Sequence, residues 1–187
     1  MSGSIRLRLF LFALAGIAVA LAVTGLGLTA LFGRHVERRL GQELDAQVAQ
    51  IAGNLRIAAD GGLSIAREPA DPRFSQPLAG LYWQVTDEKT GVLTRSRSLW
   101  DTQLDLPDDV LPPGVTHEHA VNAPDGQELI LHEKRVILGD PGRDRPVRIS
   151  VAVNRSELEP LRSGFARDLL PALAILGAIL LLSLIHI

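Results

Sequence analysis

The stretch LYWQVTDEKTGVLTRSRSLWD, residues 81–101, decides the fold predicted for this chain. Apolar residues occupy every second position at its start, at Leu81, Trp83 and Val85. This period-two alternation is typical of a half-buried strand. Residues 87–91, DEKTG, are typical of a turn, because Gly91 can adopt a positive φ. Residues 92–98 are interpreted as a second strand, so the stretch predicts an antiparallel hairpin.

Further strands are expected toward the C-terminus, at residues 115–121, 127–138 and 147–153. Turn signals separate them, most clearly the sequence APDG that ends at Gly126. Together with the hairpin, these segments predict an antiparallel sheet over residues 80–154.

An apolar block lies at each end of the chain. Residues 9–32 contain no charge, and 24 residues of helix measure roughly 36 Å, enough to cross a hydrocarbon core of about 30 Å. A cleaved signal peptide is the alternative, but the block is longer than a usual signal core and favours an uncleaved anchor. The second block begins at residue 169, in a helix expected to start at Ser156 with Glu159 completing a capping box.

These segments predict an α+β protein in which two transmembrane helices flank one small domain with a long N-terminal helix and an antiparallel sheet. The expected boundaries are a short N-terminal segment at 1–8, a first span at 9–32, a folded domain at 33–168 and the start of a second span at 169–187. The folded domain is long enough for one small core.

Residues 33–59 are expected to continue the first helix out of the membrane as a stalk. One apolar stripe runs along this segment, formed by Val36, Leu40, Leu44, Val48, Ile51 and Leu55. Two interpretations fit the spacing: a dimer stalk, carried by Val36, Leu40, Leu44 and Val48, or a helix packed on its own domain. The spacing does not separate them, and each can hold over different turns.

The last six residues, LSLIHI at 182–187, correspond to codons that match a transposon end used as an adapter in sequencing libraries. An ordinary membrane helix ending in a histidine is the alternative. We expect these residues to be an artefact, which is excluded from fold reasoning. Native sequence is then expected to continue past Leu181, because residues 169–181 are too short to span alone.

The composition excludes several kinds of functional site. The 187 residues include no cysteine, which excludes disulfides, thiolate metal sites and cysteine nucleophiles. A net charge of −2 gives no indication of nucleic-acid binding. We find no catalytic constellation and expect no cofactor and no metal. His117 and His119 share a strand face, but two histidines underdetermine a zinc site. A loop with four aspartates (Asp101, Asp105, Asp108 and Asp109) lacks calcium-loop spacing and is interpreted as solvated.

The hairpin holds the best candidates for ligand binding. Arg95 and Arg97 are expected on one strand face, where two guanidinium groups can bind an anion; salt bridges to nearby acids are the alternative. Tyr82 and Trp100 complete the candidate set. Trp83 and Trp100 are interpreted first as core residues, and as pocket-lining residues second.

Three short motifs carry a family resemblance: YWQV at 82–85, SRSLWD at 96–101 and PDGQ at 124–127. In this order they resemble the sensor domains of two-component sensor histidine kinases of proteobacterial type. Ala123 stands where the family pattern has glycine, which is a small departure. The resemblance implies a PAS-like extracytoplasmic fold and a bacterial inner-membrane protein with two spans, its N-terminus inside and residues 33–168 in the periplasm.

The same resemblance implies partners that lie outside this sequence. The family acts as homodimers, so a homodimer is expected, and a missing kinase half would bind ATP and Mg²⁺ and phosphorylate a response regulator. Two rival hypotheses remain: the input region of a chemoreceptor or cyclase, and a membrane-anchored structural protein. Only sequence beyond Leu181 separates them.

Overall fold

The structure is a computed structural model that describes residues 3–58, 61–91, 93–107, 112–123, 126–139 and 144–186. The chain forms two compact units. One comprises residues 1–38 and 158–187, and the other comprises residues 39–157.

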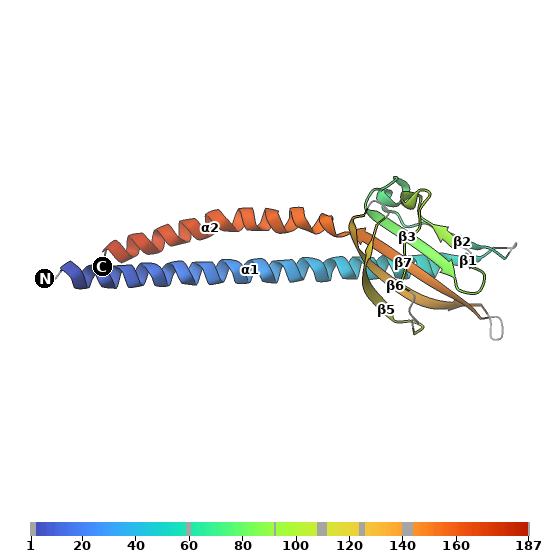
Figure 1. The fold of residues 1–187 in the computed structure, drawn as a ribbon, viewed down its shortest axis with the longest axis horizontal. Coiled ribbons are helices and arrows are strands. Elements are labelled where there is room, and N and C mark those ends of the chain that lie inside the picture. The colour runs from blue at the N-terminus through green and yellow to red at the C-terminus, as the bar shows by residue number, and fades with distance from the viewer. Residues whose placement is uncertain are drawn as a thin grey trace. The chain divides into compact units, whose positions relative to one another are not determined.

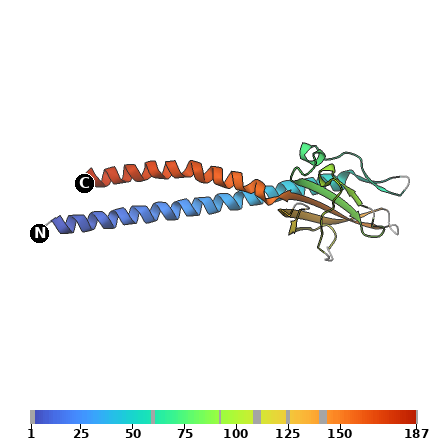
Figure 2. The ribbon, with the colours of Figure 1, turned by 45° about the horizontal axis from the view of Figure 1, so that its top comes forward.

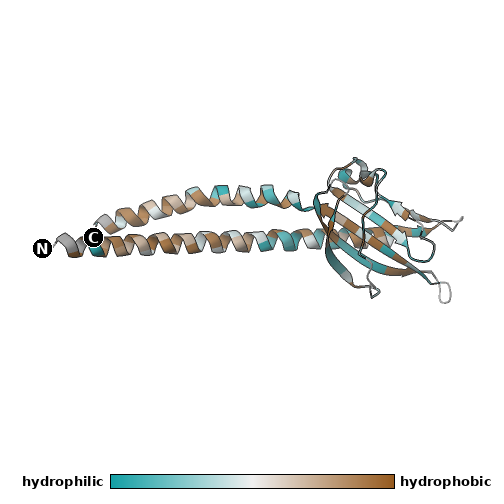
Figure 3. Ribbon diagram, viewed as in Figure 1, coloured by the Kyte–Doolittle hydropathy of each residue, from teal (hydrophilic) through white to brown (hydrophobic). Residues whose placement is uncertain are grey.

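The first unit consists of most of one long helix and all of a second. α1 spans Gly3–Asn54 and α2 spans Leu158–His186, and both are long and apolar enough to cross a membrane. Each is hydrophobic along the part nearest its chain terminus, and hydrophilic bands appear further along (Figure 3). α1 continues without a break from its apolar part into the second unit, as expected for a membrane helix that extends as a stalk. The stalk ends earlier than predicted, because strand β1 (Leu55–Ile57) replaces its last turn and pairs with β2 (Leu63–Ile65).

The second unit contains an antiparallel sheet with the strand order β4-β3-β7-β6-β5. Its strands are β3 (Leu81–Asp87), β4 (Leu93–Arg95), β5 (Thr116–Asn122), β6 (Glu128–Leu138) and β7 (Arg145–Asn154). The predicted antiparallel sheet is therefore confirmed. The end of α1 lies along one face of this sheet (Figures 1 and 2).

The predicted hairpin between β3 and β4 is confirmed, with Val85 opposite Thr94. The turn also forms as expected: Gly91 has a φ of 69° and donates its N–H to the carbonyl of Asp87. The Asp87 carboxylate accepts further bonds from the N–H groups of Lys89 and Thr90, at 2.8 and 3.2 Å. Side-chain and backbone groups thus close the turn together.

The predicted second strand is too long, because residues 97–99 form a short 3₁₀ helix, η2 (Arg97–Leu99). Two buried serines hold this segment against the edge of β3. Ser96 Oγ accepts the Trp83 N–H at 3.0 Å, and Ser98 Oγ donates to the carbonyl of Leu81 at 2.7 Å. The two hydroxyls also bond to each other at 2.8 Å. Side chains therefore satisfy backbone groups of β3 that a longer β4 would have paired.

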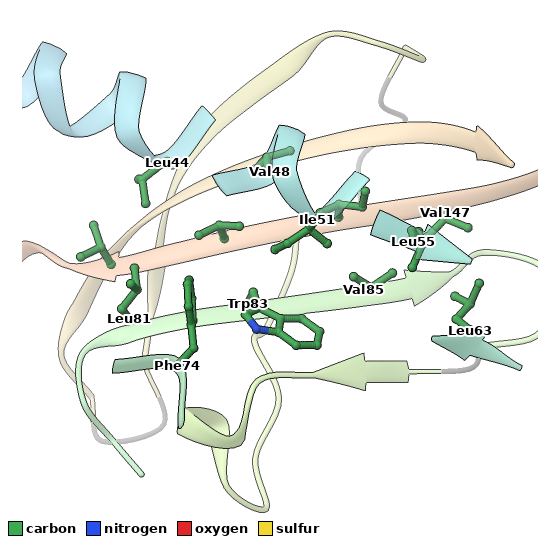
Figure 4. Packing of buried hydrophobic residues seen from close by; sticks show 13 residues of the cluster. Leu44, Val48, Ile51, Leu55, Leu63, Phe74, Leu81, Trp83, Val85 and Val147 are labelled. Carbon is green, nitrogen blue, oxygen red and sulfur yellow. The ribbon is translucent and has the colours of Figure 1, made fainter. Parts of the chain in front are cut away.

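The prediction that β3 is half-buried is wrong, because Leu81, Tyr82, Trp83, Gln84 and Val85 are all buried. β3 lies between β4 and β7, and both of its faces are covered. The face toward α1 holds the larger apolar core, shown in Figure 4. Leu44, Val48 and Ile51 of α1 point there toward Trp83 and Val85 of β3. The remaining core members are Leu81 of β3 and residues of β1, β2, β7 and the 3₁₀ helix η1 (Pro72–Ser75), which contributes Phe74.

The junction that leads into α2 differs from the predicted capping box. Ser156 lies in a 3₁₀ helix, η3 (Arg155–Glu157), and Asn154 Oδ1 accepts the Ser156 N–H at 2.9 Å. Arg73 of η1 fixes the same junction through an ion pair of 2.7 Å with Glu157. The segment that carries η1 is thus attached directly to the residue before α2.

Candidate functional site

The sheet face that points away from α1 carries charged and polar side chains inside the domain. Strand alternation places Leu129, Leu131 and Glu133 of β6 on this face, next to Ser150 and Ala152 of β7. We call it the charged face. Its apolar part is a second small core, formed by Tyr82, Leu99, Leu104, Ala123, Leu129, Leu131 and Ala152.

Glu133 is the central residue of the charged face, and its side chain is fully buried. One carboxylate oxygen lies 3.2 Å from His119 Nε2 of β5. The other lies 3.5 Å from the Ser150 hydroxyl and 3.8 Å from a guanidinium nitrogen of Arg148. A buried carboxylate is costly unless charged or hydrogen-bonding partners surround it. Such sites in structures often have functional roles, although structural ion pairs share these features.

A segment of irregular chain covers this face between Trp100 and Pro107. Two side chains of the sheet hold it by its backbone. Gln84 Oε1 accepts the Leu104 N–H at 2.8 Å, and Arg148 donates to the carbonyl of Pro107 at 2.8 Å. Arg148 therefore connects the covering segment to the buried Glu133 carboxylate.

The predicted ligand residues are only partly brought together. Tyr82 is buried in the small core of the charged face. Arg95 lies on β4 opposite Gln84 and so belongs to the same face. Arg97 is exposed in η2, so the prediction that Arg95 and Arg97 share a strand face is wrong. Trp100 is 55% exposed, which corrects its interpretation as a core residue, whereas Trp83 is 1% exposed as expected.

The histidines and the aspartate loop form no cation site in the described part of the chain, where no group of three or more His, Cys, Asp or Glu side chains could hold a metal ion. The rings of His117 and His119 stack along β5 with centroids 6.4 Å apart. Asp101 and Asp105 lie within the covering segment and are exposed, while Asp108 and Asp109 lie outside the described residues.

Sequence reasoning missed a second polar contact, on the face toward α1. His132 of β6 is buried, and its Nδ1 lies 2.8 Å from an Asp45 carboxylate oxygen on α1. Its Nε2 lies 3.8 Å from Glu118 of β5. The ring also lies close to Gly41, because a Cβ there would be 3.4 Å from the imidazole, at about van der Waals contact. This contact ties the stalk part of α1 to the far strands of the sheet.

The apolar stripe of α1 divides between two environments. Leu44, Val48 and Ile51 are buried in the core of their own domain, and Leu40 packs against that core. Val36 is half-buried. The interpretation as a core helix therefore describes Leu44 and Val48, while a dimer contact at Val36 and Leu40 stays a prediction.

Arg73 forms ion pairs with two carboxylates, one of them on the residue before α2. It contacts Asp71 through two nitrogens, one of them at 2.7 Å, and Glu157 through a third. Its hydrogen bond lowers the pKa of Asp71, and the same bond raises the pKa of Arg73. The charges of Asp71 and Arg73 therefore persist through the physiological pH range.

Comparison with known proteins gives one informative result. The chain is 31% identical over 169 residues to the sensor protein kinase CarS of Pseudomonas aeruginosa. The aligned region covers 87% of this chain and 33% of that relative. The chain thus spans about a third of the relative's length. No protein-family model matches the chain, and no solved structure matches it. The similarity supports a sensor-kinase input region and favours neither rival hypothesis.

Proposed function

We propose that this chain is the input region of a bacterial sensor histidine kinase, held in the inner membrane by α1 and α2. Residues 33–168 would form a PAS-like domain in the periplasm. The similarity to a sensor protein kinase along 87% of the chain carries this proposal. The position of the two candidate membrane helices, one before and one after the sheet domain, supports it.

The charged face is the proposed place of sensing. Two hydrogen bonds hold the covering segment there, one accepted by Gln84 and one donated by Arg148, and a ligand or solvent can replace such bonds at modest cost. Tyr82 and Arg95 contribute to this face. Arg97 lies beyond it in η2, and Trp100 follows η2 directly. These four residues remain the proposed ligand contacts.

The segment around η1 is the proposed connection to α2. η1 packs against η2, from which the covering segment begins, and its Arg73 is paired with Glu157 immediately before α2. A change in the covering segment can therefore shift the balance between two arrangements of the junction. The output would come from a kinase half beyond residue 181, working as a homodimer with ATP, Mg²⁺ and a response regulator.

Topology offers the first test. A reporter that is active only in the periplasm, fused after Asp101, should be active in bacteria. A reporter that is active only in the cytoplasm should be silent at the same position. The reverse result would place the sheet domain in the cytoplasm and refute the proposal.

The output is tested on the native gene. We expect its reading frame to continue from about Leu181 into residues other than LSLIHI. Its purified product should incorporate phosphate from ATP and Mg²⁺ on a histidine. A genuine stop codon directly after Ile187 would refute the kinase proposal and favour the membrane-anchored structural protein.

A further inference from the structure

Two close contacts join α1 and α2 within the apolar parts of these helices. A Cβ added at Gly25 of α1 would lie 2.9 Å from Leu173 Cδ1 of α2. A Cβ added at Gly177 of α2 would lie 3.0 Å from Leu21 Cδ1 of α1. Both distances are tighter than most side-chain contacts, so the tip of each leucine would have to shift if the glycine that faces it carried a side chain.

The two contacts are reciprocal. Leu21 and Gly25 are four residues apart on α1, and Leu173 and Gly177 are four residues apart on α2. Because the helices are antiparallel, each leucine fits over the glycine of the other helix. Each helix therefore provides one knob, its leucine, and one hole, at its glycine, and both lie on the same face of that helix.

The same register continues beyond the two Leu–Gly contacts. The rings of Phe32 and Phe165 are stacked, with centroids 4.1 Å apart and planes 6° from parallel. One turn further along α1, Glu37 forms an ion pair with Arg162. Four contacts at matching intervals thus describe one antiparallel register between the helices, which run side by side in Figures 1 and 2.

We propose that the reciprocal Leu–Gly contacts fix this register and make the helix pair move only in whole turns. A slide of α2 by one turn, about 5.4 Å, places Leu173 opposite Leu21 in one direction and Gly177 opposite Gly25 in the other. The first arrangement crowds two leucines, and the second leaves an unfilled space between two glycines. Intermediate positions are disfavoured because packed interfaces are bistable rather than continuously deformable.

This inference concerns the helix pair alone and does not depend on a kinase output. If the proposed function also holds, a signal that reaches α2 must overcome these contacts as a unit. The register and the function can then be tested separately, because the first is measured by cross-linking and the second by phosphorylation.

The test uses the chain in lipid nanodiscs and exploits its lack of native cysteine. Phe32→Cys combined with Phe165→Cys should form an intramolecular disulfide on oxidation. Glu37→Cys combined with Arg162→Cys gives a second reporter that leaves both phenyl rings in place. Gly25→Leu or Gly177→Leu should lower both yields several-fold.

Matched controls separate steric fit from a general effect of leucine. A Cβ at Gly27 of α1 or at Gly164 of α2 would have no atom within 4 Å, so Gly27→Leu and Gly164→Leu should leave both yields unchanged. Exchanging knob and hole, Gly25→Leu with Leu173→Gly, should restore them. The proposal is overturned if Gly25→Leu behaves like Gly27→Leu, if the exchange restores nothing, or if the parent pairs do not cross-link.

Discussion

The two faces of the central sheet are covered by different means. The end of α1 covers one face with leucine, valine and isoleucine side chains that meet Trp83 and Val85. An irregular segment covers the other face with Leu104, which packs in the smaller apolar core, and with two hydrogen bonds, one accepted by Gln84 and one donated by Arg148, near a buried carboxylate. The first cover is a contiguous apolar contact, whereas the second combines a smaller apolar core with individual polar partners.

The two faces therefore suit different roles, one in the stability of the domain and the other in its response to a signal. Opening the packing against α1 would expose apolar surface to water and remove its stabilisation, so that face is suited to stabilise the fold. Polar contacts on the charged face can be exchanged for contacts with water or ligand at little net cost. A domain that must be both stable and responsive can therefore assign one role to each face.

The largest expected effect is on the face toward α1. Trp83→Ala removes a fully buried ring and should lower the free energy of unfolding by about 3–5 kcal/mol. Trp100→Ala is the matched control, because its ring is 55% exposed and should cost roughly 0.5 kcal/mol or less. Urea unfolding of the chain in detergent, followed by circular dichroism, measures both. Equal losses would contradict the assignment of these two tryptophans to core and surface.

Much of this division could be predicted from the sequence, and some of it could not. Alternation of apolar residues identified β3 and β7, and the glycine of DEKTG identified the turn, because both signals are local. The covering of the opposite face was missed. Arg148 and Ser150 alternate with valine and isoleucine on β7, a pattern that normally indicates solvent-exposed side chains. Only the tertiary path of residues 100–107 covers this face, where Ser150 is buried and Arg148 half-buried.

The motif RSRSLWD shows the same limit. Its arginines were expected to share a strand face, but Ser96 and Ser98 turn the chain into η2 by bonding to the backbone of β3. Residue spacing does not distinguish a serine that continues a strand from one whose hydroxyl bonds to the neighbouring backbone in place of a paired strand. Tyr82 and Arg95 thus lie on the charged face, Glu133 and Arg148 were not anticipated there, and Trp100 is exposed rather than in the core; ligand binding at these residues stays a prediction.

The second prediction concerns the charged face. Arg148→Ala removes a partner of the buried Glu133 carboxylate and the donor to the Pro107 carbonyl. It should lower the free energy of unfolding by about 2–4 kcal/mol, because a buried charge loses its compensation. Arg148→Ala combined with Glu133→Gln should recover part of this loss. Failure to recover any of it would mean that Arg148 stabilises the domain through the covering segment alone.

A matched control lies one strand pair away. Arg135 faces Arg148 across the β6–β7 ladder and pairs with Glu88 at 2.9 Å on the surface. Arg135→Ala should cost at most about 1 kcal/mol, as is usual for solvent-exposed ion pairs. Similar losses for the two arginines would remove the distinction between buried and exposed charge on this face.

The third prediction uses acid to test the turn that joins β3 to β4. Burial alone would raise the pKa of Asp87, but hydrogen bonds from Thr90, Lys89 and Arg145 outweigh burial and lower this pKa to about 2. Its ordinary value is 3.8, so the ionised form contributes about 2 kcal/mol above pH 4. A group with a lowered folded-state pKa loses its contribution as the pH falls.

We therefore expect stability to decline between about pH 4 and pH 2, in the window set by the two pKa values. Asp87→Asn should be less stable than the parent at pH 7 and should lack this part of the decline. Urea midpoints at pH 7, 4 and 2 measure the difference. A decline of the same size in Asp87→Asn would assign it to other carboxylates.

The smallest stability effect is expected at the two arginines of the hairpin. Arg95 is half-buried on the charged face, and Arg97 is exposed on η2, so Arg95→Ala and Arg97→Ala should each change the free energy of unfolding by about 0.5 kcal/mol or less. Their effects on signalling should differ. If the charged face senses the signal, Arg95→Ala should alter phosphorylation by the full native protein, and Arg97→Ala should alter it less because its side chain lies beyond that face. Phosphorylation of both variants is measured with and without inducing conditions. A larger change for Arg97→Ala than for Arg95→Ala would place the site of sensing on the exposed surface around η2 and Trp100 instead of on the charged face. Unchanged signalling in both variants would leave these arginines as surface residues, and the division of labour between the two faces would then rest on Arg148 and Glu133.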